Sequence, residues 1–178
     1  LASPAGAQKK PPVETPKLTP HLGDLESAKA LAKERNAPVL IHMVLDGEAD
    51  NDSYREKVLK DTELIKASVG AVVLIANNGT HSKKEVDGKK VCEVYPMFDS
   101  CGKHQQNWDA LYGLYKEDSG DLRCPQVILL LPDGKEHMRW HDGTVPAAED
   151  VRGSLLEAVK LAGPSLTAEQ LETVKKLA

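Results

Sequence analysis

The most constraining feature of this sequence is a short apolar run that turns sharply and continues as a second strand. Residues 127–131 are apolar at every position and are followed by Pro132-Asp133-Gly134. A run of this length between turn residues predicts a buried β-strand. The Pro-Asp-Gly segment predicts a tight turn, because proline presets one backbone dihedral and glycine accepts a positive φ. Side chains then alternate over 137–141, so we predict a β-hairpin that begins just after Cys124 and Pro125.

Helical and strand patterns alternate through the rest of the chain. Continuously apolar runs predict strands that are covered on both faces, and apolar residues at helical spacing predict amphipathic helices. The form of a capping box at Ser53 to Glu56 places the start of the second helix. The predicted order is helix 24–35, strand 38–44, helix 53–68, strand 71–76, helix 104–116, the hairpin, a core helix 151–162 and a short C-terminal helix capped at Thr167.

This order of elements resembles the thioredoxin fold over roughly residues 22–163. In that family a cis-proline opens the penultimate strand and faces the active site, which implies that Pro125 is the cis-proline. The resemblance implies an α/β fold, a central mixed sheet flanked by helices. This chain adds a cysteine-containing insertion (77–104) after the third strand and an extra C-terminal helix. The family's Cys-x-x-Cys would follow strand 38–44, but the residues there contain no cysteine, so the usual redox dithiol is missing.

Composition separates a tail from the domain and limits the partners. Residues 1–20 hold five prolines among small and charged residues, so we expect a disordered tail before a domain over 21–163 and a C-terminal helix over 164–178. The net charge of −4 and the lack of a long basic run argue against nucleic acid as a partner. No apolar stretch is long enough to span a bilayer.

The first residues also suggest a compartment. An Ala/Ser/Gly-rich start without methionine is typical of what remains after a signal peptide is removed, although a cloning boundary gives the same pattern. We expect an extracytoplasmic protein, periplasmic or secreted. Three cysteines in an oxidising compartment leave one unpaired.

All three cysteines fall where the resembled fold does its chemistry. Open α/β sheets bind ligands beyond the carboxyl ends of their parallel strands. By the resemblance, three loops meet at that end of the sheet, and they carry residues 46–52, residues 92–104 and Cys124 with Pro125. The resemblance therefore predicts a site that gathers sulfur side chains at one end of the sheet.

The tightest group of candidate ligands is Cys92, Cys101 and His104, with Cys124 as a further ligand and Met97 as a weak neighbour. Cys101 and His104 are three residues apart at a predicted helix start, where both can face the same way and the helix N-terminus favours a thiolate. Sulfur with imidazole suits copper or zinc better than calcium or magnesium. We therefore predict a soft-metal site.

Two other interpretations of the cysteines stay open. Cys92 and Cys101 can form a disulfide that pins the insertion, closing a short ring worth about 2–3 kcal/mol. The domain would then serve to bind a partner protein. In the other interpretation the chain is a non-canonical thiol-disulfide oxidoreductase, in which Cys101 or Cys92 exchanges with Cys124 and His104 helps to hold a thiolate. We rank metal binding first, because the acidic loop, the imidazole and three sulfurs all suit a cation.

Other polar residues are assigned structural roles. The alternating acids after strand 38–44 resemble a calcium loop but lack its glycine and its bidentate glutamate. We interpret them as solvated loop acids that favour the start of the second helix: Asp46, Glu48, Asp50 and Asp52. His42 is interpreted as a hydrogen-bonded core residue. His81 opens the insertion and is an additional candidate ligand whose direction the sequence does not fix, and His137 with His141 is a weak metal pair at best.

Overall fold

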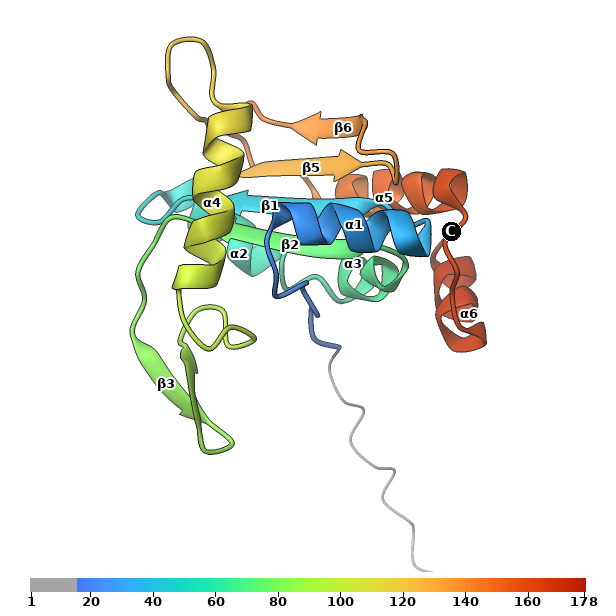
Figure 1. Cartoon of the computed structure of the whole chain (residues 1–178), viewed down its shortest axis with the longest axis horizontal. Helices are drawn as coiled ribbons and strands as arrows, with labels where there is room; N and C mark the ends of the chain where they lie inside the picture. Colours follow the sequence, from blue (N-terminus) through green and yellow to red (C-terminus); the bar gives the residue numbers. More distant parts are fainter. Residues whose placement is uncertain (1–15) are drawn as a thin grey trace, which may run out of the picture.

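The centre of the computed structural model, which describes residues 16–178, is a four-stranded mixed sheet (Figure 1). Its order is β2-β1-β5-β6, with β1 parallel to β2 and antiparallel to β5, and β5 antiparallel to β6. The strands are β1 Val39–Val44, β2 Val72–Asn77, β5 Gln126–Leu130 and β6 Glu136–Trp140. The predicted strands and hairpin are therefore present, and the expected tail falls mostly outside the described residues.

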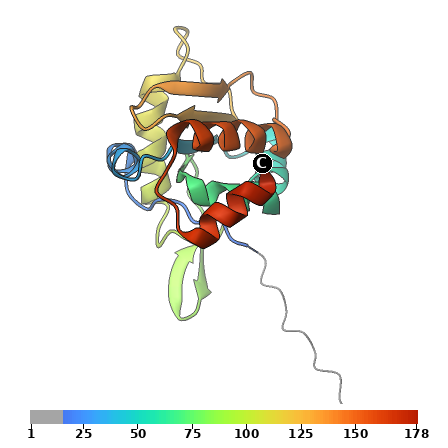
Figure 2. The same ribbon diagram turned by 90° about the vertical axis from the view of Figure 1, so that its right-hand side faces the viewer.

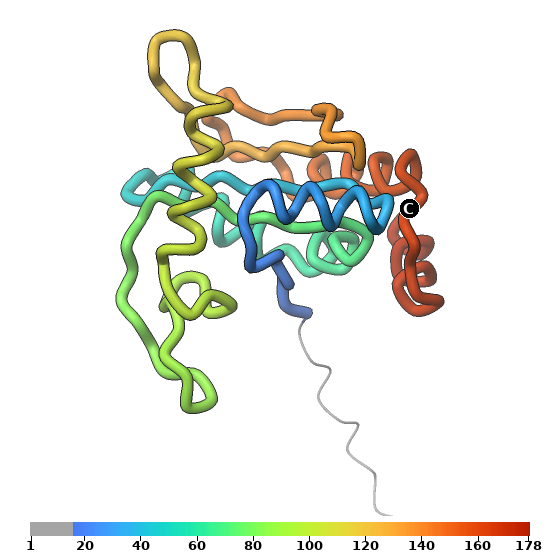
Figure 3. Tube along the Cα trace, in the orientation of Figure 1, coloured from blue at the N-terminus to red at the C-terminus, as the bar shows by residue number. Residues whose placement is uncertain are grey.

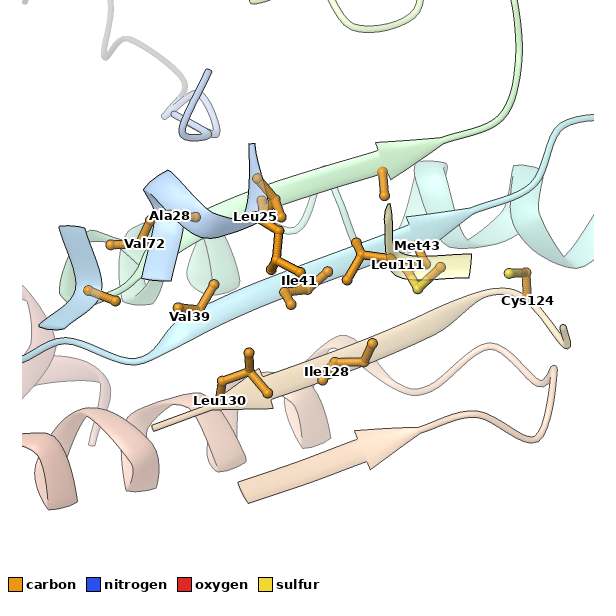
Figure 4. Close-up of a cluster of buried hydrophobic side chains, with 13 residues drawn as sticks. Leu25, Ala28, Val39, Ile41, Met43, Val72, Leu111, Cys124, Ile128 and Leu130 are labelled. Atoms are coloured by element: carbon orange, nitrogen blue, oxygen red, sulfur yellow. The ribbon is translucent and has the colours of Figure 1, made fainter. Parts of the chain in front are cut away.

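Helices cover both faces of this sheet, because successive residues of a strand point to opposite sides. On one face α1 (Leu25–Arg35) and α4 (Gly102–Tyr115) pack over Ile41 and Met43 (Figure 4). On the other face, Leu40 and Val44 are buried by three further helices: α2 (Ala49–Lys57), α3 (Thr62–Ala67) and α5 (Ala148–Ala162). This is the thioredoxin-like architecture that the sequence predicts. Within the described residues no helix is long and apolar enough to cross a membrane.

The second predicted helix is wrong in its bounds. The structure has two shorter helices there, and Ser53 lies inside α2, which begins four residues earlier at Ala49. The break has a local cause, because the side chain of Asp61 accepts a hydrogen bond from the N–H of Leu64 (2.7 Å) and starts α3 as its N-cap. A turn over 58–61 therefore separates the two helices.

The C-terminal helix agrees with its predicted cap. Helix α6 (Ala168–Leu177) starts with a complete capping box between Thr167 and Gln170. Its residues Val174 and Leu177 contact the same apolar cluster as α3 and α5. The added helix therefore extends the core on one face of the sheet, at the end opposite to the insertion (Figure 1).

The insertion contains a β-hairpin, with β3 (Lys83–Val86) antiparallel to β4 (Lys89–Cys92). Asp87 and Gly88 at its tip both have positive φ, as a type I′ turn requires. The hairpin projects away from the sheet (Figure 2), and the chain then returns to the start of α4 (Figure 3).

The insertion was expected after a third strand, and along this chain it follows β2, the second strand. The segment before α1 lies beside β2 and donates a hydrogen bond from His21 N–H to Val73 O (2.7 Å), but within the described residues it forms no strand. The strand that the resemblance implied before β1 is therefore missing from the described residues, and the insertion follows the second strand instead of the third.

Candidate metal centre

Four side chains of the insertion and of α4 converge on one point. They are His81 just before β3, Cys92 at the end of β4, Cys101 at the N-cap of α4, and His104 in its first turn. One ligand atom from each lies within 4.8 Å of the ligand atoms of the other three. The centre lies where β2 ends, since Asn77, the last residue of β2, contacts His104.

The distances between the ligand atoms are short and similar. The Sγ atoms of Cys92 and Cys101 lie 3.7 Å apart. His81 Nδ1 lies 3.3 Å from the Cys92 sulfur and 3.6 Å from the Cys101 sulfur, and His104 Nε2 lies 3.8 Å from the Cys92 sulfur. Both cysteines are free thiols, so the disulfide that the sequence left open is not formed here.

The second nitrogen of each imidazole is held from outside the group. His81 donates its Nε2–H to Asp46 Oδ2 (2.8 Å), and His104 donates its Nδ1–H to the carbonyl of Asn77 (3.0 Å). Because a carboxylate and a carbonyl only accept hydrogen bonds, these contacts place the proton on the outer nitrogen of each ring. His81 Nδ1 and His104 Nε2 therefore turn unprotonated lone pairs toward the sulfurs, as metal-binding histidines do.

Asp46 also accepts hydrogen bonds from neighbours outside the four converging residues. Its Oδ1 accepts hydrogen bonds from Arg55 Nη1 (2.6 Å) and from the side-chain amide of Asn77 (2.9 Å). Burial alone would raise the pKa of this carboxyl, but the hydrogen bonds from Asn77 and Arg55 and the nearby His81 together lower the pKa. Asp46 is therefore an ionised acceptor, which corrects the interpretation of this residue as a solvated loop acid.

The centre is enclosed by apolar and aromatic groups. Cys92 and His104 are fully buried, and Tyr95 and Phe98 pack edge-on or tilted against the histidine rings. Burial raises the pKa of the Cys92 thiol and lowers the pKa of His104, because both charged forms lose water. Without a cation, burial therefore favours the neutral thiol of Cys92 and the neutral imidazole of His104.

Cys124 lies elsewhere. It is buried in the apolar cluster beneath α1 and α4, beside Met43 (Figure 4), and it is not among the four converging residues. Burial raises the pKa of its thiol to about 12. The Cys124–Pro125 peptide bond is cis. The strand order explains the separation, because Cys124 precedes β5 on one side of β1, whereas the four ligands lie beyond β2 on the other side.

The structure thus brings together three of the four predicted ligands and adds His81. The resemblance placed the three loops at one end of the sheet, which is correct, but it did not distinguish the two sides of β1. Met97 packs against the apolar cluster that contains Cys92 and Cys101. The pair His137 and His141 lies outside the converging group.

Comparisons with known proteins agree with the fold. No protein-family model matches the sequence, and no curated protein sequence matches it significantly. Among solved structures, the chain is similar to a DsbH oxidoreductase, with a TM-score of 0.56 and 15% sequence identity over 89% of this chain and 96% of that one. This likeness confirms the predicted thioredoxin-like fold.

Proposed function

We propose that this thioredoxin-like protein binds one soft metal ion, zinc foremost, through His81, Cys92, Cys101 and His104. The observation that carries the proposal is the convergence of two sulfur and two nitrogen lone pairs within 4.8 Å of one another. Two cysteines and two histidines are one of the standard ligand sets of tetrahedral structural zinc.

The spacing supports tetrahedral coordination. With zinc–sulfur bonds of about 2.3 Å and zinc–nitrogen bonds of about 2.0–2.1 Å, a tetrahedron has sulfur–sulfur edges of about 3.8 Å and sulfur–nitrogen edges of about 3.5 Å. The corresponding distances here are 3.7 Å between the sulfurs and 3.3, 3.6 and 3.8 Å from sulfur to nitrogen. These four distances agree with the edges of a tetrahedral site, which supports the proposal.

Charge favours a divalent ion over cuprous copper. Two thiolates and two neutral imidazoles sum to −2, and the adjacent Asp46–Arg55 ion pair contributes no net charge. Zn²⁺ makes the buried centre neutral, whereas Cu⁺ leaves one negative charge in an environment that penalises unpaired charge. Copper remains the alternative occupant, because sulfur ligands also suit Cu⁺.

Four protein ligands leave no open position on a tetrahedral ion, so we propose that the protein binds the metal without using it in catalysis. We also propose that the protein is extracytoplasmic, and this location bears on the state of the cysteines. In an oxidising compartment, two thiols 3.7 Å apart are exposed to disulfide formation, and a bound metal ion protects them.

Native mass spectrometry of protein purified without chelator or reductant tests the proposal. We expect one zinc ion per chain, with every thiol reduced, and loss of the adduct after dialysis against a chelator. Cobalt(II) reconstitution of the same protein is expected to give the visible absorption of a tetrahedral sulfur–nitrogen site. A metal-free protein that takes up neither ion, even with its thiols reduced, would refute metal binding.

The second candidate function is redox exchange at Cys92 and Cys101. The observation that favours it is their sulfur–sulfur separation of 3.7 Å, close enough to reach the bond length of about 2.05 Å with a small movement. Cys124 is a poor partner for exchange, because burial holds its thiol neutral with a pKa of about 12. In the mass spectrum this function predicts a metal-free chain lighter by two hydrogens, together with disulfide reductase activity that is lost in Cys101→Ser.

The hairpin gives a further prediction, because site residues flank it: His81 lies just before β3 and Cys92 ends β4. A two-stranded hairpin on its own is marginally stable in water, and every residue of β3 is exposed. Removing the metal should therefore speed hydrogen exchange of the β3–β4 amides, while those of the buried strand β1 change little. Exchange followed by mass spectrometry, with and without chelator, measures this. Equal exchange rates in the hairpin would mean that the metal does not hold it.

A further inference from the structure

We infer that Asp46 is the positioning residue of this metal centre: it fixes the tautomer and direction of His81, and Arg55 in turn holds Asp46 in place. The inference rests on the proposed metal binding and identifies which residue outside the coordination shell tunes it. Asp46 lies two residues after β1, in the loop where the resembled family carries its dithiol. In this chain the same loop contributes a carboxylate to a metal site.

His81 needs such support more than the other histidine does. His81 lies in the irregular segment between β2 and β3, so no helix or strand fixes its side chain. His104 stands in α4, and it bonds to the backbone carbonyl of Asn77, which no side-chain substitution removes. The hydrogen bond to Asp46 Oδ2 (2.8 Å) therefore selects which nitrogen of His81 faces the sulfurs.

Asp46 can do this because its own position is over-determined. Besides accepting from Arg55 and Asn77 through Oδ1, it donates its backbone N–H to Asn78 Oδ1 (3.0 Å). Arg55 comes from α2, and its side chain is only 16% exposed. The carboxylate therefore joins the ends of β1 and β2 to α2, and it leaves its Oδ2 atom for His81.

The charge of Asp46 also acts on the metal. A carboxylate that accepts the imidazole N–H makes the opposite nitrogen a stronger electron donor, and loss of such a partner typically costs about 10- to 100-fold in metal affinity. An asparagine keeps the shape and one acceptor oxygen but loses the charge. It also brings an NH₂ group toward Arg55 or Asn77, which already donate. Asp46→Asn should therefore weaken binding, and Asp46→Ala should weaken it further.

Chelator competition with Zn²⁺ and the absorption spectrum of the Co²⁺-loaded protein test the inference on the full chain. We expect zinc affinity to fall about 10- to 100-fold in Asp46→Asn. The cobalt bands should shift even at saturating metal. The matched control is Asp52→Asn, since Asp52 also pairs with Arg55 but is exposed and does not contact His81. This control is expected to keep the affinity and the spectrum of the wild type.

If the Asp46 variants are less stable than the wild type, the cobalt spectrum distinguishes the two explanations. An effect on stability alone would leave the spectrum of the cobalt-saturated site unchanged. Wild-type binding combined with equal affinity and equal spectra in Asp46→Asn would overturn the inference and leave the proposed function standing. Failure of the wild type to bind either metal would overturn both.

Discussion

Replacing His81 with alanine is expected to lower the zinc affinity of the protein by roughly 10²- to 10³-fold. Structural zinc sites bind with about 10–16 kcal/mol, so each of four ligands carries roughly 2.5–4 kcal/mol, and 1.4 kcal/mol corresponds to a factor of ten. His81 Nδ1 lies within 3.6 Å of both sulfurs, and its loss leaves the ion with three protein ligands. Competition with a chromophoric chelator measures the change.

The matched control for this substitution is Cys124→Ala. Cys124 is as strong a ligand candidate by residue type as His81, but it is buried in the cluster beneath α1 and α4. Removing its sulfur should therefore leave zinc affinity unchanged while it costs some stability through the small cavity. The measurement would contradict the four-residue centre if His81→Ala bound zinc as tightly as the wild type, or if Cys124→Ala lost binding.

The contrast between His81 and Cys124 shows how much of the site could be predicted from the sequence. The sequence predicts Cys92, Cys101 and His104 because the spacing of Cys101 and His104 at a helix start is local, and because the insertion follows a parallel strand. His81 could not be assigned, since it lies in an irregular segment without periodicity. The resemblance also predicts Cys124 as a ligand, because it orders loops around a sheet edge without saying on which side of β1 each side chain lies.

The contact between Asp46 and His81 could have been predicted from the positions of the two residues in the sequence. Asp46 lies two residues after β1, and His81 comes soon after the neighbouring parallel strand β2. Because the carboxyl ends of adjacent parallel strands lie side by side, Asp46 and His81 are expected to lie close together. The alternation of acids in that loop resembles a calcium loop, whereas the position of Asp46 relative to the end of β1 indicates its contact with His81.

The fold was predictable where patterns are long and continuous. The largely apolar strands β1, β2 and β5 predict helices on both faces, and the structure has them. Boundaries that depend on one side chain were less predictable. The capping-box form at Ser53 predicts a helix start there, whereas α2 begins at Ala49 and Asp61 caps the separate helix α3.

A buried histidine gives the second large prediction, an acid-dependent loss of stability. His42 in β1 is fully buried, and burial lowers its pKa to about 3 from the ordinary 6.5. Its Nδ1 is hydrogen-bonded to the hydroxyl of Tyr54, and its Nε2 has no partner among the described residues. The ring therefore stays neutral in the folded protein at pH values where the unfolded chain already carries the proton.

The sign follows from this difference. Between pH 6.5 and about 3 the unfolded state binds one more proton at this residue than the folded state, so acid favours unfolding. The contribution of His42 to stability is intact above pH 6.5 and falls by about 1.4 kcal/mol for each pH unit below it. At pH 4.5 the expected loss is about 2–3 kcal/mol, and it reaches about 4–5 kcal/mol near pH 3.

The double variant His42→Leu with Tyr54→Phe isolates this effect, because it removes both hydrogen-bonding partners together and leaves no new unpaired group. Urea unfolding of chelator-treated protein at pH 7 and pH 4.5 should show about 2–3 kcal/mol less acid destabilisation than in the wild type. Tyr54→Phe alone keeps the buried imidazole and should keep the full pH dependence. If the double variant lost as much stability between the two pH values as the wild type, another group would be responsible. That result would mean that the folded protein protonates His42 without a cost in free energy. This conflicts with a ring that has no exposed surface and one unpaired nitrogen.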